Sequence, residues 1–348
     1  MIVFEAVRAL IIFALSFVTA VFLTTVFLRL IERFGLKKSN IRDGQTAPVF
    51  NKFHHQKSDT PTMGGVIIWG SVIGLAFLFL IFQKVFNGFG DYFSFVSRAE
   101  TYLPLAAMLL AALLGLLDDI FGILGIGPNG GGLRIKHKLI LYLLIGALGA
   151  WWFYFKLGFD TLYLPFFGHV FIGWWYIPFF IFILMASTFS ANETDGLDGL
   201  LGGTMLFSFG ALSVVAFVLH RYDLAMMGTA VLGALLAFLW FNIYPARFFM
   251  GDTGSMALGV TLGVMAMLTN TVLLLPFFAL IPLIETLSVI IQVFSKKFLG
   301  RKVFLSAPIH HHFEALGWPE SRVTMRFWIV SALAAAFGLV IFFLARFV

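Results

Sequence analysis

The chain has 348 residues, of which 60% are hydrophobic and only 11% are charged, whereas a soluble globular chain carries about 25% charged residues. So few charges cannot cover a water-exposed surface of this size, which excludes a soluble protein and predicts a polytopic membrane protein. The net charge of +6 is explained by a cationic cytoplasmic face beside anionic lipid, so no nucleic-acid partner is expected, and the lack of cysteine excludes disulfides and thiolate metal sites.

Ten apolar segments approach the length of about 20 residues that a helix needs to cross a bilayer. In chain order they cover roughly 8–31, 61–82, 102–117, 139–155, 170–190, 199–219, 223–241, 255–269, 271–294 and 323–346. The first is expected to be a retained helix, since no small-residue cleavage site follows it. The predicted fold class is all-α and polytopic, with about ten transmembrane helices in one integral membrane domain over 1–348.

The positive-inside rule orients these spans. Of the 23 Lys and Arg residues, 17 fall on one set of loops and 6 on the other. The first set is therefore predicted to be cytoplasmic, and both termini are predicted to be extracytoplasmic. The expected cytoplasmic loops are about 32–60, 118–138, 191–198, 242–254 and 295–322.

Every unusual polar stretch falls on the predicted cytoplasmic side. In chain order these are "HHQKSDTPTMGG" (54–65), "LLDDIFG" (116–122), "GGLRIKHK" (131–138), "ANETDGLDG" (191–199), "WFNIYPARFFMGDTGS" (240–255) and "APIHHHF" (307–313). Because five loops on one side of the membrane supply them, we expect a single site at the cytoplasmic membrane boundary.

Asp118 and Asp119 come at the end of a predicted span. The C-terminal end of a helix disfavours anions, so a bound cation or a cationic side chain is expected beside the pair. Adjacent carboxylates also raise one another's pKa, which suits one of them to accept a proton. The alternative is an ordinary solvated helix end.

Three further aspartates complete an acidic cluster. Asp195 and Asp198 are three residues apart and would share a face if helical, although Thr194 or Asp195 could instead cap the following span. Asp252 could likewise cap the eighth predicted span, with its carboxylate still accessible between glycines. Hard oxygen ligands of this kind suit Mg²⁺ and phosphoryl chemistry.

Basic side chains accompany these acids. Lys57 and Lys138 adjoin polar motifs and are candidates to bind a pyrophosphate, whereas positive-inside loops explain most of the other cations.

The triple histidine, residues 310–312, follows Pro308, so we expect an extended backbone that sends alternate side chains in opposite directions. Hydrogen bonding of neutral imidazole to phosphate or sugar oxygens is favoured over a zinc site, because no carboxylate or cysteine stands at a familiar ligand spacing.

Six motifs, in the same order from about residue 40 to 330, resemble the phospho-N-acetylmuramoyl-pentapeptide transferase family. They are "TPTMGG", the Asp118–Asp119 pair, "NETDGLDG", "FLWFNIYPARFFMGDTGS", "ETLSVIIQV" and "APIHHHFEALGWPESRVTMRFW". The family is a branch of the polyprenyl-phosphate N-acetylhexosamine-1-phosphate transferases. The last two motifs argue against the alternative of a sibling enzyme that uses UDP-N-acetylglucosamine.

The resemblance implies transfer of phospho-N-acetylmuramoyl(MurNAc)-pentapeptide from UDP-MurNAc-pentapeptide to undecaprenyl phosphate, giving lipid I and UMP. It also implies an Mg²⁺ cofactor and a homodimer in the bacterial cytoplasmic (inner) membrane. A direct displacement and a two-step route through an aspartyl-phosphate both stay open. A secondary transporter is the alternative from another class, but the acids gather at one face rather than at the midplane.

The resemblance also assigns roles to residues. Asp118, Asp119 and Asp252 correspond to catalytic positions, with Asp252 as the Mg²⁺ ligand and the other two as further candidates. The substrate-binding positions are Lys57, Thr62, Lys138, Asn192, Asp195, Asp198, Asn242, Phe249, Gln292, His310, His311 and His312. The chain departs from the family pattern at Asp59, Gly122, Phe189 and Glu193.

Overall fold

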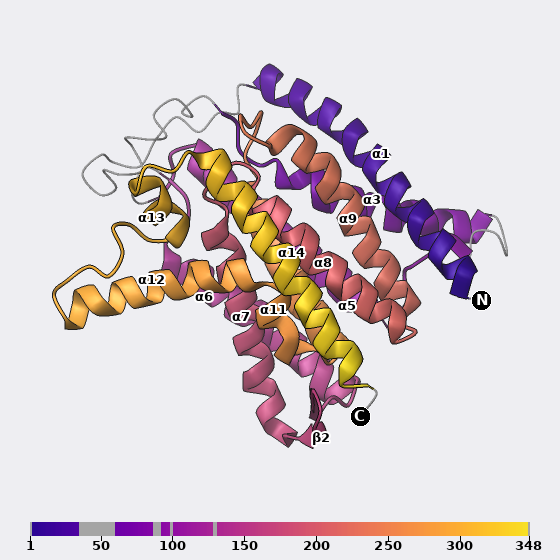
Figure 1. Ribbon diagram of the computed structural model, residues 1–348. Coiled ribbons are helices and arrows are strands. Elements are labelled where there is room, and N and C mark those ends of the chain that lie inside the picture. Colours follow the sequence, from indigo (N-terminus) through magenta and orange to yellow (C-terminus); the bar gives the residue numbers. More distant parts are fainter. Residues whose placement is uncertain (1, 35–59, 86–91, 98–99, 128–130, 347–348) are drawn as a thin grey trace.

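The computed structural model describes residues 2–34, 60–85, 92–97, 100–127 and 131–346, which are mostly helical (Figure 1). The long apolar helices are α1 (Ile2–Phe34), α3 (Gly65–Val85), α5 (Tyr102–Ile123), α6 (Ile135–Trp151), α7 (Tyr176–Thr194), α8 (Leu200–Val218), α9 (Tyr222–Asn242) and α14 (Glu320–Leu344). The other helices are α10 (Gly251–Leu268), α11 (Leu275–Phe278), α12 (Leu280–Phe298) and α13 (Ile309–Ala315), and a π-helical turn (Trp152–Lys156) extends α6.

Within this described part, eight helices are long and apolar enough to cross a membrane. A ninth crossing results if α11 and α12, which are bent by 88° at their junction, count as one broken span. The shorter α10 stands where the eighth span was expected. The prediction of an all-α polytopic membrane protein is therefore confirmed.

A short hairpin departs from the expected helices. Strands β1 (Thr161–Leu164) and β2 (Gly168–Phe171) pair antiparallel, with Thr161 opposite Phe171. The span predicted at roughly 170–190 is present, but the hairpin moves its start to Gly173, where a 3-10 turn leads into α7 at Tyr176. Phe166 in the turn and Gly168 at the start of β2 have positive φ values of 69° and 82°, as tight turns often require.

Both termini lie at the same end of the bundle, away from α13 (Figure 1). This arrangement agrees with an even number of crossings. Which end faces the cytoplasm stays a prediction from the Lys and Arg distribution.

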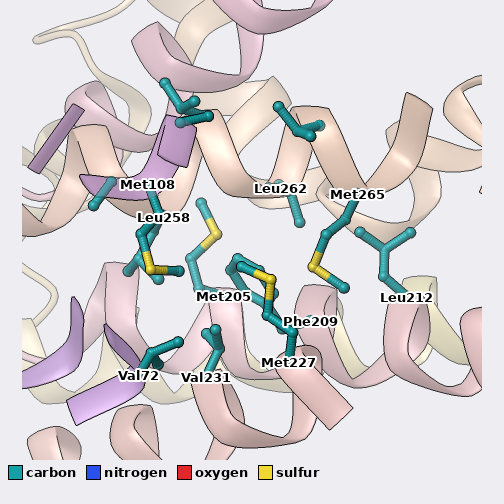
Figure 2. Packing of buried hydrophobic residues seen from close by; sticks show 14 of the residues in the cluster. Val72, Met108, Met205, Phe209, Leu212, Met227, Val231, Leu258, Leu262 and Met265 are labelled. Carbon is teal, nitrogen blue, oxygen red and sulfur yellow. The ribbon is translucent and has the colours of Figure 1, made fainter. Parts of the chain in front are cut away.

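Helix α10 forms the centre of the bundle. Every residue from Thr253 to Leu268 is buried, as expected of a helix that is apolar on all sides. Figure 2 shows Leu258, Leu262 and Met265 of this helix among side chains of α8 and α9, including Met205 and Met227. The flexible methionines fill the gaps between these helices.

Glycines bring α3 and α5 against the first turn of α10. A Cβ on Gly65 of α3 would lie 2.2 Å from the Cα of Gly254, and one on Gly115 of α5 would lie 2.3 Å from the carbonyl oxygen of Asp252. Small residues allow such close backbone contact between membrane helices. The position of Asp252 therefore depends on the absence of a side chain at 115.

We predict that Gly115→Ala lowers the free energy of unfolding by about 1–3 kcal/mol, because the methyl group must push the α10 backbone away. Thermal melting of the detergent-solubilised protein measures this. The matched control is Gly74→Ala on α3, where a Cβ meets nothing within 4 Å. The control should melt no lower than wild type, since alanine favours helix by about 1 kcal/mol. Equal melting temperatures for the two variants would contradict the packing argument.

Candidate active site

Two carboxylates from outside α10 cap its N-terminus. The backbone N–H groups of Asp252 and Thr253 donate to Oδ1 and Oδ2 of Asp119, at 3.2 and 3.0 Å. The N–H of Gly251 donates to Oδ2 of Asp195 at 3.1 Å. These first N–H groups have no partner within a helix, and the helix dipole favours anions there. Asp119 and Asp195 thus hold the start of α10 in place.

This arrangement corrects two predictions about the acids. Asp252 does not cap α10: it is the second helical residue, and Met250 occupies the N-cap position. Asp195 and Asp198 do not share a helical face, because they lie in the connection between α7 and α8. Helix α7 ends at Thr194, and Gly199, with a left-handed φ of 74°, is the N-cap residue of α8.

Lys138 joins two of the carboxylates. Its Nζ lies 2.8 Å from Oδ2 of Asp118 and also donates to Oδ2 of Asp252. The cation expected beside the acidic pair is thus a lysine from the first turns of α6. The other oxygen of Asp118 accepts the backbone N–H of Leu133.

Asn192, near the end of α7, completes this network. Its Nδ2 donates to Oδ1 of Asp252 at 2.6 Å and to Oγ of Ser255 at 3.1 Å. Asp118, Lys138, Asn192 and Asp252 therefore come from four different helices and meet at the N-terminus of α10.

The segment before α3 closes another side of the site. Its backbone is tied to the segment before α10 by bonds from the N–H of Gly64 to the Phe249 carbonyl and from the N–H of Phe249 to the Pro61 carbonyl, both 2.8 Å. A Cβ on Gly251 would lie 2.7 Å from Oγ1 of Thr62. Gly251 also has a φ of 75°, so its conformation and its crowding both require glycine. The candidate Lys57 lies outside the described residues.

Asp198 and Asn242 connect two loops of the site. Asp198 accepts the N–H of Ala246 at 3.0 Å. Asn242 accepts the N–H of Gly199 at 3.0 Å and donates to the Phe248 carbonyl at 2.8 Å. Their observed bonds fix backbone segments, and a role in substrate binding stays a prediction for both.

Gln292 has a similar structural role on α12. Its side-chain oxygen accepts the N–H groups of Val303 and Phe304 at 3.1 and 3.0 Å, and its nitrogen donates to the Phe304 carbonyl at 2.9 Å. The whole amide therefore holds the segment that follows α12.

The three histidines lie on the short helix α13, so the prediction of an extended backbone is wrong. Pro308 precedes the first helical residue, a place where its fixed φ and missing N–H are tolerated. The three rings have different partners. Nδ1 of His310 pairs with Glu285 Oε2 at 2.9 Å, Nδ1 of His311 pairs with Glu314 Oε2 at 2.7 Å, and Nδ1 of His312 accepts the N–H of Leu305 at 3.2 Å.

Two ionisable groups of the site that lie outside the spans have shifted pKa values. Burial, reinforced by the Asp252 carboxylate, raises the pKa of Asp195 to about 7. Burial lowers the pKa of His310, but the Glu285 carboxylate more than offsets this and raises the pKa overall.

No group of three or more His, Asp or Glu side chains in the described residues is arranged as a metal site. The donor chemistry nevertheless fits Mg²⁺, because two carboxylates, Asp118 and Asp252, converge on a single cationic group. The magnesium assignment stays a prediction.

The sequence interpretation missed Glu285 as a functional candidate. This residue is fully buried on α12, within an apolar span. An ionisable side chain inside a membrane helix is a functional candidate by default, so the stretch "LIPLIETLSVIIQ" contained the signal.

Comparisons with known protein families identify the class of transferase that the chain resembles. The profile of Glycosyl transferase family 4 matches residues 101–270, which include Asp118, Asp119, Lys138, Asn192 and Asp252. A Phospho-N-acetylmuramoyl-pentapeptide-transferase signature matches residues 57–68.

Curated relatives narrow the class to one family. The phospho-N-acetylmuramoyl-pentapeptide-transferases of Geobacillus sp. (strain WCH70) and Geobacillus thermodenitrificans are 39% and 40% identical to this chain, over 94% of it and 95% and 96% of their own lengths. The enzyme of the same name from Bacillus velezensis is 36% identical, over 94% and 95%. The chain belongs to the phospho-N-acetylmuramoyl-pentapeptide-transferase family and is a transferase.

We predict that removing the carboxylate of Asp119 loosens the start of α10. Asp119→Ala should lower the free energy of unfolding by about 1–2 kcal/mol, the usual effect of losing a helix cap. Asp119→Asn keeps one acceptor oxygen and should lose less. Thermal melting compares the two variants. A wild-type melting temperature for Asp119→Ala would show that the cap is dispensable.

The raised pKa of His310 predicts a pH-dependent contribution to stability. A base whose pKa is higher in the folded state stabilises the fold below its unfolded pKa, and this stabilisation is lost as the pH rises through the folded pKa. The melting advantage of wild type over His310→Gln should be largest below pH 6.5, the ordinary histidine value, and should shrink above it. His169→Gln, at an exposed position on β2, is the control. An advantage that grows with pH would contradict the assignment.

Proposed function

We propose that this enzyme transfers phospho-MurNAc-pentapeptide from UDP-MurNAc-pentapeptide to undecaprenyl phosphate, giving lipid I and UMP at the cytoplasmic face of the bacterial inner membrane. The observation that carries the proposal is the network of Asp118, Lys138, Asn192 and Asp252 at the N-terminus of α10. A lysine beside two carboxylates that could hold Mg²⁺ suits the binding of a pyrophosphate.

The two members of the acidic pair have different roles in this proposal. Asp119 uses both carboxylate oxygens to accept N–H groups of α10. Asp118 faces Lys138 instead. We therefore assign Asp118 to contact with the lipid phosphate, as the group that positions it or takes its proton, and Asp119 to the support of α10.

Asp252 and Asp118 are the residues that would hold Mg²⁺. When bound, the ion would neutralise negative charge on the pyrophosphate. Lys138 contributes a second positive charge at the same place, and Asn192 orients Asp252 through its amide. An oxygen of the lipid phosphate forms a bond to the β-phosphorus of the UDP-sugar while the bond from that phosphorus to the UMP oxygen breaks, so phospho-MurNAc-pentapeptide is transferred and UMP leaves.

The exposed apolar face of helix α12 is consistent with a lipid acceptor. It leaves the bundle after the bend and projects from it (Figure 1). Its side chains at Leu287, Ile290 and Phe294 are exposed and apolar. A polyprenyl chain could lie against these side chains within the bilayer while its phosphate reaches the site. A homodimer is part of the proposal by resemblance to the family.

The direct test is UMP release from the purified protein with Mg²⁺, undecaprenyl phosphate and one UDP-sugar at a time. UDP-MurNAc-pentapeptide should give UMP and lipid I, whereas UDP-N-acetylglucosamine should give neither. Turnover of UDP-N-acetylglucosamine alone would assign the chain to the sibling reaction.

We predict that Asp252→Asn lowers kcat by at least about a hundredfold, because an amide cannot supply the charge that this site needs around the pyrophosphate. The melting temperature should stay close to wild type. Asp160→Asn, next to β1 and outside the site, is the matched control and should keep full activity. Normal turnover by Asp252→Asn would refute the assignment of Asp252, and full activity in excess EDTA would refute the magnesium assignment.

A further inference from the structure

Glu285 and His310 form a buried pair between a membrane helix and α13. Glu285 is 0% exposed and His310 is 1% exposed. Oε2 of Glu285 lies 2.9 Å from Nδ1 of His310 and also accepts the backbone N–H of His310 at 3.4 Å. The carboxylate therefore fixes both the position of the ring and the nitrogen that faces it.

Each member of the pair has one buried atom without a hydrogen-bond partner in the described part of the chain, namely Oε1 of Glu285 and Nε2 of His310. A buried polar atom without a partner carries an uncompensated desolvation cost. Two apolar side chains of similar volume would fill the same space without this cost, and such replacements of buried ion pairs are often neutral or stabilising. Packing alone therefore does not account for the pair.

Nε2 of His310 is directed at the acidic loop, which is the segment 195–199 between α7 and α8. A Cβ on Gly196 would lie 2.2 Å from this nitrogen. Gly196 stands between Asp195, which caps α10, and Asp198, which accepts the Ala246 N–H. The unpartnered nitrogen thus lies against the loop that holds the catalytic helix.

We propose that Glu285 is a positioning residue of the transfer reaction: it holds Nδ1 of His310 so that Nε2 is presented at Gly196 as a donor to an oxygen of the bound nucleotide-sugar. This inference rests on the proposed function. Because Nε2 lies against the Gly196 backbone, the donation requires the 195–199 segment to shift when the substrate binds.

The charges around His310 favour the donor form. Glu285 of α12 and Glu314 of α13 are the nearest contributors, and Glu193 at the end of α7 adds to them. Asp195 faces it from the loop, and the ring of His311 lies 4.1 Å away between centroids. With three glutamates raising the pKa of His310, both ring nitrogens carry protons over a wider pH range, and Nε2 remains a donor.

The experiment measures kcat/KM for UMP release as a function of pH in Glu285→Gln, His310→Gln and the double variant. Glu285→Gln should lower kcat/KM by about tenfold to a hundredfold, the usual effect of removing the outer partner of a functional imidazole. It should also move the alkaline limb of the profile to lower pH, because the carboxylate that raises the pKa of His310 is gone. The double variant should be no slower than His310→Gln, since the two residues act as one unit.

Two further variants separate positioning from packing. Thr286→Val removes a buried hydrogen bond to Ser190 (2.8 Å) from the same helix and should leave the pH profile unchanged. Glu285→Leu combined with His310→Leu should melt no lower than wild type and yet lose the activity. This double apolar variant also covers the case in which Glu285→Gln fails to fold.

Three outcomes would overturn the inference. They are an unshifted pH profile with kcat/KM within about twofold of wild type in Glu285→Gln, independent multiplying effects of the two single substitutions, or an active double apolar variant. Failure of the proposed function looks different, because wild type itself would then release no UMP from UDP-MurNAc-pentapeptide.

Discussion

The hydrogen bonds that the first N–H groups of α10 make to Asp119 and Asp195 are the interactions on which the site depends. The helix is buried from Thr253 onward and partly buried at Gly251 and Asp252, so its first N–H groups, which lack partners within the helix, are best satisfied by partners from the protein. Carboxylates satisfy them and also complement the helix dipole. Because one carboxylate belongs to α5 and the other to the loop after α7, the same bonds that satisfy α10 also fix the relative positions of three segments.

This constraint accounts for the proposed division of roles among the acids. Once Asp119 and Asp195 are occupied by the backbone, Asp118 and Asp252 are left to face Lys138. The close contacts of Gly65 and Gly115 with α10 make the arrangement tight enough for one ammonium group to reach both carboxylates. Away from the N-terminus of α10, Asn242 and Gln292 hold loop backbones in place. The Glu285–His310 pair lies against the acidic loop at Gly196. The proposed chemistry is therefore concentrated at one helix terminus, which polar side chains from most of the neighbouring elements support.

The spans could be predicted from the sequence because apolarity and length determine them, and the acidic cluster because its members fell on one predicted side of the membrane. The errors arose where three-dimensional context decides the local structure. The histidines at 310–312 are helical because Pro308 can precede a helix as readily as it follows a strand. Asp252 looked like a cap, but a cap is defined by its partners, and the true caps come from Asp119 and Asp195, which lie more than 50 residues away in the sequence. Glu285 was overlooked because its partner is contributed by another helix.

The central claim is that capping of α10 brings Asp252 and Lys138 together as one functional unit. A double-mutant cycle on kcat for UMP release, with Lys138→Gln and Asp252→Asn, tests it most directly. The account predicts that the double variant is no slower than the slower single variant, because either substitution already breaks the unit. Reductions in kcat that multiply in the double variant would show that the two side chains act independently, and would contradict the account.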